Sequence, residues 1–227
     1  MSLWITIAAV LKSSGYHPFR HSGYHPLSLG VSPTRPNEIE AQGYPQPAIF
    51  PINFESATSQ DYLQLKTALE QEFAAIDGLL HNAGMLGPKT NVEQYSSEQW
   101  QSVFNVNCHA PFLLTQTLLP LLKQSKQASV VFTSSGVAQR GRAYWGAYAA
   151  SKAAQDNLMQ TLADEYDDTP SVRFNSINPG ATRTAMRATA YPAESPDSLP
   201  SPEAHAFKYA YLFADISKGA NGLIFCC

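Results

Sequence analysis

From about residue 45 onward, the chain alternates between short apolar segments and longer segments with helical periodicity. The short segments are nearly continuous in apolar and β-branched residues, which is typical of strands buried on both faces. Strands that alternate with helices form parallel sheets covered on both sides, so the pattern predicts an α/β fold. The predicted strands are 47–54, 76–84, 128–135 and 171–180, and the predicted helices are 58–75, 96–125 and 147–167.

Local signals place several of the helix boundaries. Tyr62, Leu65 and Leu69 recur at helical spacing in the first helix, and a serine cap ahead of Glu98 or Gln99 opens the second. Pro170 follows the third helix and cannot continue it. These boundary signals support the predicted alternation of strands and helices.

Composition narrows the class of protein. The 227 residues are 44% hydrophobic, which indicates an ordinary globular chain, and we expect one domain over residues 1–227. A net charge of -3 with scattered lysines and arginines argues against nucleic acid or an anionic membrane as partner. The three cysteines form no disulfide framework, so we expect a reducing compartment, the cytoplasm. The apolar stretch 1–12 is interpreted as neither a signal peptide nor a membrane span.

In parallel α/β sheets, chemistry gathers at the carboxyl ends of the strands. That expectation selects Asn82-Ala83-Gly84, Ser134-Ser135 and Pro179-Gly180, each at the end of a predicted strand. The proline-rich segment 186–202 is expected to lie at the surface and to cover the substrate.

One tyrosine and one lysine stand out beside these strand ends. Tyr148 follows Ser135 by thirteen positions, and Lys152 lies one helical turn beyond Tyr148, so both side chains share a helix face. A tyrosine hydroxyl with a pKa of about 10 is a poor base, and a nearby ammonium favours the phenolate. We therefore expect Lys152 to lower the pKa of Tyr148 and Ser135 to hydrogen-bond the reacting oxygen.

Five motifs in register carry a family resemblance. They are NAG at 82–84, VNCHAPF around Asn107, SS at 134–135, YAASK at 148–152 and NPGATRT at 178–184. With them, the chain resembles the short-chain dehydrogenase/reductase family over about residues 39–216, and particularly the bacterial YciK-like oxidoreductases. The resemblance implies a Rossmann-type, doubly wound parallel sheet in a three-layer α/β/α arrangement.

The resemblance also implies an activity, which is hydride transfer between NADP or NAD and a small carbonyl or alcohol substrate, with NADP slightly favoured. Tyr148 would be the general acid or base, Lys152 would also bind the nicotinamide ribose, and Asn107 would hold a water of a proton relay. Family members commonly pair two long helices, so we expect a homodimer or homotetramer through 96–125 and 147–167. The implied catalytic residues are Asn107, Ser135, Tyr148 and Lys152, and the implied cofactor-binding residues are Asn82, Ala83, Gly84, Tyr148, Lys152, Pro179, Gly180 and Thr184.

Each of these residues also has a purely structural interpretation. Asn107 could cap or kink its helix, Ser135 could end a strand, and Tyr148 and Lys152 could be helix-surface residues. His17, His21 and His25 recur at helical spacing, but Pro18 and Pro26 forbid a regular helix there. We therefore expect no metal site.

The N-terminal segment 1–38 departs from the family. The family opens with a strand and a TGxxxGxG loop that receives the cofactor pyrophosphate, yet no GxxxGxG occurs in this sequence. The apolar stretch 3–11 could fill the slot of the first strand, and Asn53 stands where the family usually has an aspartate near the adenine. A frameshift or mispredicted start before residue 38 is one explanation. The alternative function is therefore a non-catalytic binding protein, or a defective product, of the same fold.

Overall fold

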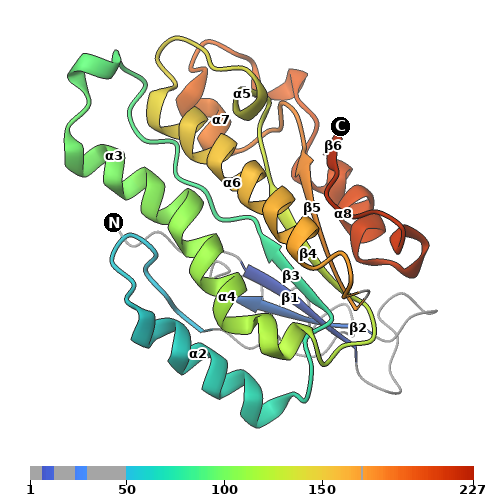
Figure 1. The fold of residues 1–227 in the computed structure, drawn as a ribbon. Coiled ribbons are helices and arrows are strands. Elements are labelled where there is room, and N and C mark those ends of the chain that lie inside the picture. The colour runs from blue at the N-terminus through green and yellow to red at the C-terminus, as the bar shows by residue number, and fades with distance from the viewer. Residues whose placement is uncertain (1–6, 13–23, 30–49, 170) are drawn as a thin grey trace.

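The computed structural model describes residues 7–12, 24–29, 50–169 and 171–227. All strands in these ranges belong to one six-stranded sheet, in the order β2-β1-β3-β4-β5-β6 (Figure 1). The strands are β1 (Ile7–Lys12), β2 (Tyr24–Leu29), β3 (Gly78–His81), β4 (Ala128–Thr133), β5 (Val172–Asn178) and β6 (Ile224–Cys226).

The strands from β3 to β6 run parallel, as the sequence predicts. Leu80 lies opposite Val131 in the pairing of β3 with β4, and Ser176 lies opposite Ile224 in the pairing of β5 with β6. The carboxyl ends of these strands therefore meet at one edge of the sheet, which is where ligands bind in open α/β folds.

The first two strands differ from the family pattern. β1 occupies the slot beside β3, as expected for the stretch 3–11, but it runs antiparallel, with Ile7 opposite His81 and Val10 opposite Gly78. β1 therefore ends at Lys12 beyond the amino end of β3, at the edge of the sheet opposite the parallel carboxyl ends. A turn after β1 consequently cannot take the place of the family's phosphate-binding loop.

Helices cover both faces of the sheet. In Figure 1, α2, α4 and α6 lie over one face, and α8 lies beyond β5 and β6. Leu114, Leu118 and Met159 belong to the larger apolar core on the first face, and Leu212 of α8 belongs to a smaller cluster on the second. The helices are α2 (Ser59–Glu72), α3 (Ser97–Phe104), a π-helical turn (Asn105–His109), α4 (Ala110–Leu122), α5 (Gly136–Gln139), α6 (Gly146–Glu165), α7 (Ala185–Ala190) and α8 (Ala206–Phe213).

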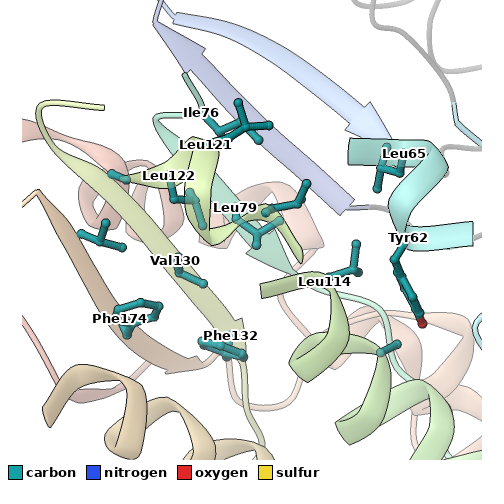
Figure 2. Packing of buried hydrophobic residues seen from close by; sticks show 14 of the residues in the cluster. Tyr62, Leu65, Ile76, Leu79, Leu114, Leu121, Leu122, Val130, Phe132 and Phe174 are labelled. Atoms are coloured by element: carbon teal, nitrogen blue, oxygen red, sulfur yellow. The ribbon is translucent and has the colours of Figure 1, made fainter. Parts of the chain in front are cut away.

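The central strands are buried on both faces. Val130, Phe132 and Phe174 point into the larger core (Figure 2), whereas Val131 and Ile177 join the cluster under α8. This two-sided burial explains why the segments read as continuous apolar runs instead of alternating ones. The three-layer, Rossmann-type architecture predicted from the sequence is confirmed.

Local side-chain contacts account for two of the helix starts. Thr58 and Asp61 form a reciprocal capping box at α2, where the Thr58 N–H donates to Asp61 Oδ2 at 2.7 Å. Ser96 and Gln99 form the same motif at α3, as the sequence predicts. The long apolar pattern 96–125 is not one regular α-helix, because the π-helical turn separates α3 from α4.

The predicted strand 47–54 is wrong over its described part, residues 50–54. Asn53 makes a turn there, in which its carbonyl accepts from Ser56 N–H at 3.1 Å and its Oδ1 accepts from Glu55 N–H at 3.2 Å. An asparagine side chain that bonds the backbone two residues on favours a turn over a ladder. Residues 50–54 therefore lead into α2 without pairing in the sheet.

The histidines of the N-terminal segment lie mostly outside the described residues, namely His17 and His21. Within the described ranges, no three His, Cys, Asp or Glu side chains gather as a metal site would require. None of the helices described is long and apolar enough to cross a membrane.

Candidate active site

The carboxyl ends of β3, β4 and β5 and the first turns of α6 surround a pocket of about 780 Å³. α7 and α8 complete its wall, because Met186 and Tyr209 line it. The pocket thus lies at the sheet edge that the sequence singled out. Most of the residues selected from the sequence line it, namely Asn82, Ser135, Tyr148, Lys152, Pro179, Gly180 and Thr184.

Ala83, Gly84 and Asn107 are not among the residues that line the pocket. A Cβ atom on Gly84 would lie 3.8 Å from Asn107 Oδ1 and 3.9 Å from Lys152 Nζ. Gly84 therefore sits between the lysine and the asparagine, and the motifs at 82–84, 107 and 148–152 converge on one place.

Tyr148 lies in the first turn of α6 and is 8% exposed. Burial raises the pKa of its hydroxyl, while a hydrogen bond with the Ser135 side chain acts in the opposite direction. The expected lowering of the Tyr148 pKa by Lys152 is therefore wrong for the protein without ligands. The reason is that removal from water disfavours the phenolate and that the Lys152 ammonium is engaged elsewhere.

Lys152 is buried one turn after Tyr148, and its Nζ donates to Thr133 O at 2.8 Å and to Gln155 Oε1 at 3.0 Å. Burial lowers the pKa of Lys152 to about 8, against the attraction of the Asp156 carboxylate, which raises it. A lysine of this pKa changes charge close to neutral pH. That property suits a residue that has to tune a neighbouring acid.

Ser134 and Asp156 form a buried pair that sequence reasoning missed. Ser134 Oγ donates to Asp156 Oδ2 at 2.5 Å, and Asp156 Oδ1 has no hydrogen-bond partner among the described residues. The only sequence signal was spacing, because Asp156 follows Lys152 by four positions on α6 and so shares its helix face.

Asn107 lies in the π-helical turn with no exposed surface. Its Nδ2 donates to Met85 O and to Ser151 Oγ, both at 2.9 Å, and its Oδ1 accepts from Met85 N–H at 2.7 Å. The side chain therefore fastens the loop after β3 to α6. Its participation in a water relay stays a prediction.

Two of the predicted nicotinamide-side residues have well-defined backbone roles. Gly180 adopts a φ of +73°, which favours glycine, and its N–H donates to Asn178 Oδ1 at 3.0 Å. Thr184 is the N-cap of α7, where its Oγ1 accepts from Arg187 N–H at 3.1 Å. Both residues fix the path of the chain from β5 into α7.

The pocket walls also contain residues that the sequence motifs did not indicate. Leu86, Trp145 and Met186 pack against the apolar cluster that contains Tyr148. Tyr209 of α8 shares a hydrogen bond of 3.2 Å with Thr133 Oγ1. The only sequence signal for these residues is weak. Leu86 and Met186 lie two positions after the motifs NAG and NPGATRT but belong to neither motif.

A serine, a buried tyrosine and a lysine one turn later, at the carboxyl edge of a parallel sheet, define a class of oxidoreductase. In agreement, residues 19–195 match the family model of the short chain dehydrogenases. The chain belongs to this family and is an enzyme of its oxidoreductase type. The match begins at residue 19, so the resemblance extends upstream of residue 38.

Among particular proteins, the chain is 46% identical to the oxidoreductase YciK of Escherichia coli K12 over 180 residues, which is 79% of this chain and 71% of YciK. A crystal structure of a short chain dehydrogenase from Escherichia coli CFT073, complexed with NADPH, superposes with a TM-score of 0.82 at 43% identity, covering 87% of this chain and 83% of that one. The structure of a short chain dehydrogenase from Pseudomonas syringae superposes with a TM-score of 0.84 at 50% identity, covering 87% of this chain and 82% of that one.

The described residues fit one half of a nicotinamide dinucleotide. Tyr148, Lys152, Pro179 and Gly180 line one pocket, and their polar groups suit a nicotinamide ring and its ribose. The pyrophosphate half has no counterpart in the described part of the chain, because β1 points away from this edge and GxxxGxG is absent. The described residues therefore suit the nicotinamide end of the cofactor, where the reaction takes place, and not its pyrophosphate.

Proposed function

We propose that the chain reduces a carbonyl compound, or oxidises the corresponding alcohol, with a nicotinamide cofactor in the pocket between β4, β5 and α6. The observation that carries the proposal is the pairing of Tyr148 and Lys152 beside Ser135 in one pocket. When bound, NADPH or NADP+ would supply or accept the hydride at nicotinamide C4. In the direction of reduction, one carbonyl, one NADPH and one proton give one alcohol and one NADP+.

Each of the chain's residues has a distinct task in this proposal. The Tyr148 hydroxyl gives its proton to the substrate oxygen in reduction and takes it back in oxidation. Ser135 hydrogen-bonds the same oxygen and orients the carbonyl. With a cofactor bound, the Lys152 ammonium would exchange one of its present protein partners for the ribose hydroxyls. Only in that position would it favour the phenolate form of Tyr148.

The remaining site residues would shape the cofactor's surroundings. Pro179, Gly180 and Thr184 would border the nicotinamide, and Asn82 with Ala83 and Gly84 would shape the turn toward the adenosine half. Asn82 already accepts a hydrogen bond from Thr133 Oγ1 at 2.9 Å, which ties the ends of β3 and β4 together. NADP is favoured over NAD because related structures were determined with NADPH and with NADP.

Fluorescence titration with NADPH tests the proposal. We expect wild-type protein to bind NADPH, and Lys152→Met to bind it at least about tenfold more weakly, since the ribose would lose a charged donor. Lys126→Met, which changes an exposed lysine, is the matched control and should bind as the wild type does. Absence of binding at millimolar NADPH would overturn the proposal for this chain.

The proton-transfer role has its own prediction. Tyr148→Phe should keep NADPH affinity within about twofold and lose at least about 100-fold in turnover of a carbonyl probe, because general acid catalysis contributes that much or more. Melting curves followed by circular dichroism verify that the variant folds. Unchanged turnover in the phenylalanine variant would rule out Tyr148 as the acid.

A second candidate function is favoured by the antiparallel direction of β1 together with the missing glycine motif. In that case the chain retains the pocket but binds ligands without turnover. The NADPH titration distinguishes the two functions, and a melting curve separates a folded binding protein from a defective product.

We further propose that the protein assembles as a homodimer or homotetramer through α4 and α6 and resides in the cytoplasm. Phe112 of α4 is a large apolar side chain that is 41% exposed, and all three cysteines are free thiols. Light scattering coupled to size-exclusion chromatography measures the assembly directly.

A further inference from the structure

Three apolar side chains form the wall next to the reactive tyrosine. Leu86, Trp145 and Met186 pack against the cluster that contains Tyr148, and all three line the pocket. The Trp145 ring centroid lies 5.7 Å from that of Tyr148. Because each of the three is only partly buried, each keeps surface to offer to a ligand. A substrate that presents its carbonyl to Tyr148 must place its neighbouring groups against this wall.

Charge in the wall is largely neutralised by the protein itself. Of the described residues that line the pocket, the basic ones are Lys152, Arg187 and His205, and none is acidic. Arg187 forms a bidentate ion pair with Glu194, in which Nε lies 2.6 Å from Oε2 and Nη2 lies 2.7 Å from Oε1. The Arg187 guanidinium also lies 3.8 Å from the centroid of the Tyr191 ring. The Nε–Nη2 edge of the guanidinium is therefore occupied, and the Glu194 carboxylate neutralises the charge that would attract a substrate carboxylate.

Two further cations near the pocket are likewise engaged. Lys89 Nζ donates to Ala190 O at 2.7 Å and lies 4.7 Å from the centroid of Trp145 and 4.6 Å from that of Tyr191. Arg183, which does not line the pocket, faces Asp197 at 3.5 Å. The contact of Lys89 also fixes the Trp145 ring, because the ammonium bridges it to Tyr191 at the end of α7.

We propose that the pocket takes a neutral carbonyl compound with an aromatic or similarly flat apolar group beside the carbonyl, and that it discriminates against carboxylate- or phosphate-bearing substrates. The flat group lies against Trp145, with Leu86 and Met186 on its other sides, and the ion pair of Arg187 with Glu194 withholds a counter-charge from anions. Aromatic rings favour stacked or edge-on contact, which this wall provides. This substrate class rests on the proposed function, since it assumes that the carbonyl meets Tyr148.

A matched pair of probes tests the substrate class without any need for turnover. 1-Phenylpropane-1,2-dione and phenylglyoxylate share the phenyl ketone, and they differ in carrying an acetyl group or a carboxylate beside it. Protein labelled with 5-fluorotryptophan reports binding through the fluorine resonance of Trp145. That resonance is assigned by its loss in Trp145→Phe, and the other two tryptophans of the chain act as internal references.

The neutral dione should shift the Trp145 resonance and saturate, with an affinity at least about tenfold higher than that of phenylglyoxylate. Glu194→Gln removes the charge that neutralises Arg187, so phenylglyoxylate should bind about five- to tenfold more tightly while the dione is unaffected. Asp197→Asn is the matched control, because it releases the exposed Arg183, which does not line the pocket, and should change neither affinity.

Equal or tighter binding of phenylglyoxylate by the wild-type protein would overturn the inference, as would a Trp145 resonance that neither probe moves. Unchanged phenylglyoxylate affinity in folded Glu194→Gln would overturn the role of the ion pair. The measurements are made without cofactor, so their outcome is separate from that of the NADPH titration. A preference for the dione in a protein that fails to bind NADPH would uphold the ligand preference of the pocket and reject the proposed activity.

Discussion

At the scale of single residues, the balance of forces on Lys152 determines what the site can do. Burial disfavours the ammonium and sets the pKa of Lys152 at about 8, whereas the Asp156 carboxylate one turn later favours it. His81 and Cys108 are also near enough to interact electrostatically with Lys152. Of these neighbours, the Asp156 carboxylate does most to maintain the positive charge, ahead of Cys108, and Ser134 fixes the carboxylate in place through a hydrogen bond of 2.5 Å.

Replacing Asp156 by asparagine should therefore lower the pKa of Lys152 below about 8. The change preserves the shape of the side chain and removes its charge, so the ammonium loses a favourable interaction and titrates at lower pH. Carbon-13 NMR of labelled lysine follows the Cε resonance of Lys152, assigned by its absence in Lys152→Met.

Asp164→Asn, an exposed change on the same helix, provides the control and should leave the titration midpoint unchanged. A midpoint in Asp156→Asn equal to or above that of the wild type would contradict the prediction. Because the readout is the lysine itself, it is independent of cofactor binding.

At the scale of secondary-structure elements, the π-helical turn connects the sheet to the helix that carries Tyr148. Asn107 in this turn has three hydrogen bonds, two to the backbone of Met85 and one to Ser151. Such turns are frequent at functional sites because they break the regular ladder. Here the turn brings a fully buried amide between the loop after β3 and α6.

Replacing Asn107 by alanine should destabilise the protein by about 1–3 kcal/mol, because buried polar groups on Met85 and Ser151 would lose their partner. Urea unfolding measures the change. Asn157→Ala, at an exposed position of α6, serves as control and should leave stability unchanged or slightly raised, since alanine favours helix. Equal stability of Asn107→Ala and the wild type would show that these hydrogen bonds contribute little.

Sequence patterns predicted some elements better than others, and the difference has a physical cause. β3, β4, β5, α2 and α6 follow from local features such as apolar runs, caps and a terminating proline. The direction of β1 does not, because pairing with β3 decides it and an apolar stretch reads the same in both directions. The strand predicted at 47–54 is absent over its described part, residues 50–54, because the hydrogen bonds of Asn53 compete with strand pairing.

The candidate site divides in the same way. Ser135, Tyr148 and Lys152 were recognisable from their spacing along the chain, and Asn107 from the family resemblance. The structure brings these residues close together. Trp145, Asp156 and the ion pair of Arg187 with Glu194 depend on contacts between elements, which spacing does not encode. The pKa of Tyr148 was misjudged because burial, the dominant influence, was not visible in the sequence.

At the scale of the whole molecule, the parallel sheet buries one titratable group that the proposed chemistry does not use. His81 ends β3 beneath α4, where its Nε2 shares a hydrogen bond of 2.8 Å with Thr115 Oγ1 and its ring stacks on Phe132. Burial is the main cause that lowers the pKa of His81 to about 3, and the Lys152 charge adds to it. The folded protein therefore holds this imidazole neutral down to low pH, whereas the unfolded chain protonates it near 6.5.

This difference makes the fold sensitive to acid. Between about pH 6.5 and pH 3 the unfolded state binds one proton more at His81, so the free energy of unfolding should fall by about 1.4 kcal/mol per pH unit from this group alone. Above pH 6.5 the contribution is constant. His81→Gln removes the titration, so its stability deficit relative to the wild type at pH 7 should shrink steadily as the pH falls to 5.

Urea unfolding at pH 7, 6 and 5 measures both proteins side by side, and the difference between them isolates His81 from the carboxylates that also titrate. His109→Gln, at an exposed position of the π-helical turn, is the matched histidine control and is measured at the same three pH values. A constant gap between wild type and His81→Gln across this range would mean that the imidazole is protonated in the folded state. A protonated His81 would then repel the Lys152 ammonium, which is the same interaction that adds to the lowering of the His81 pKa in the folded protein.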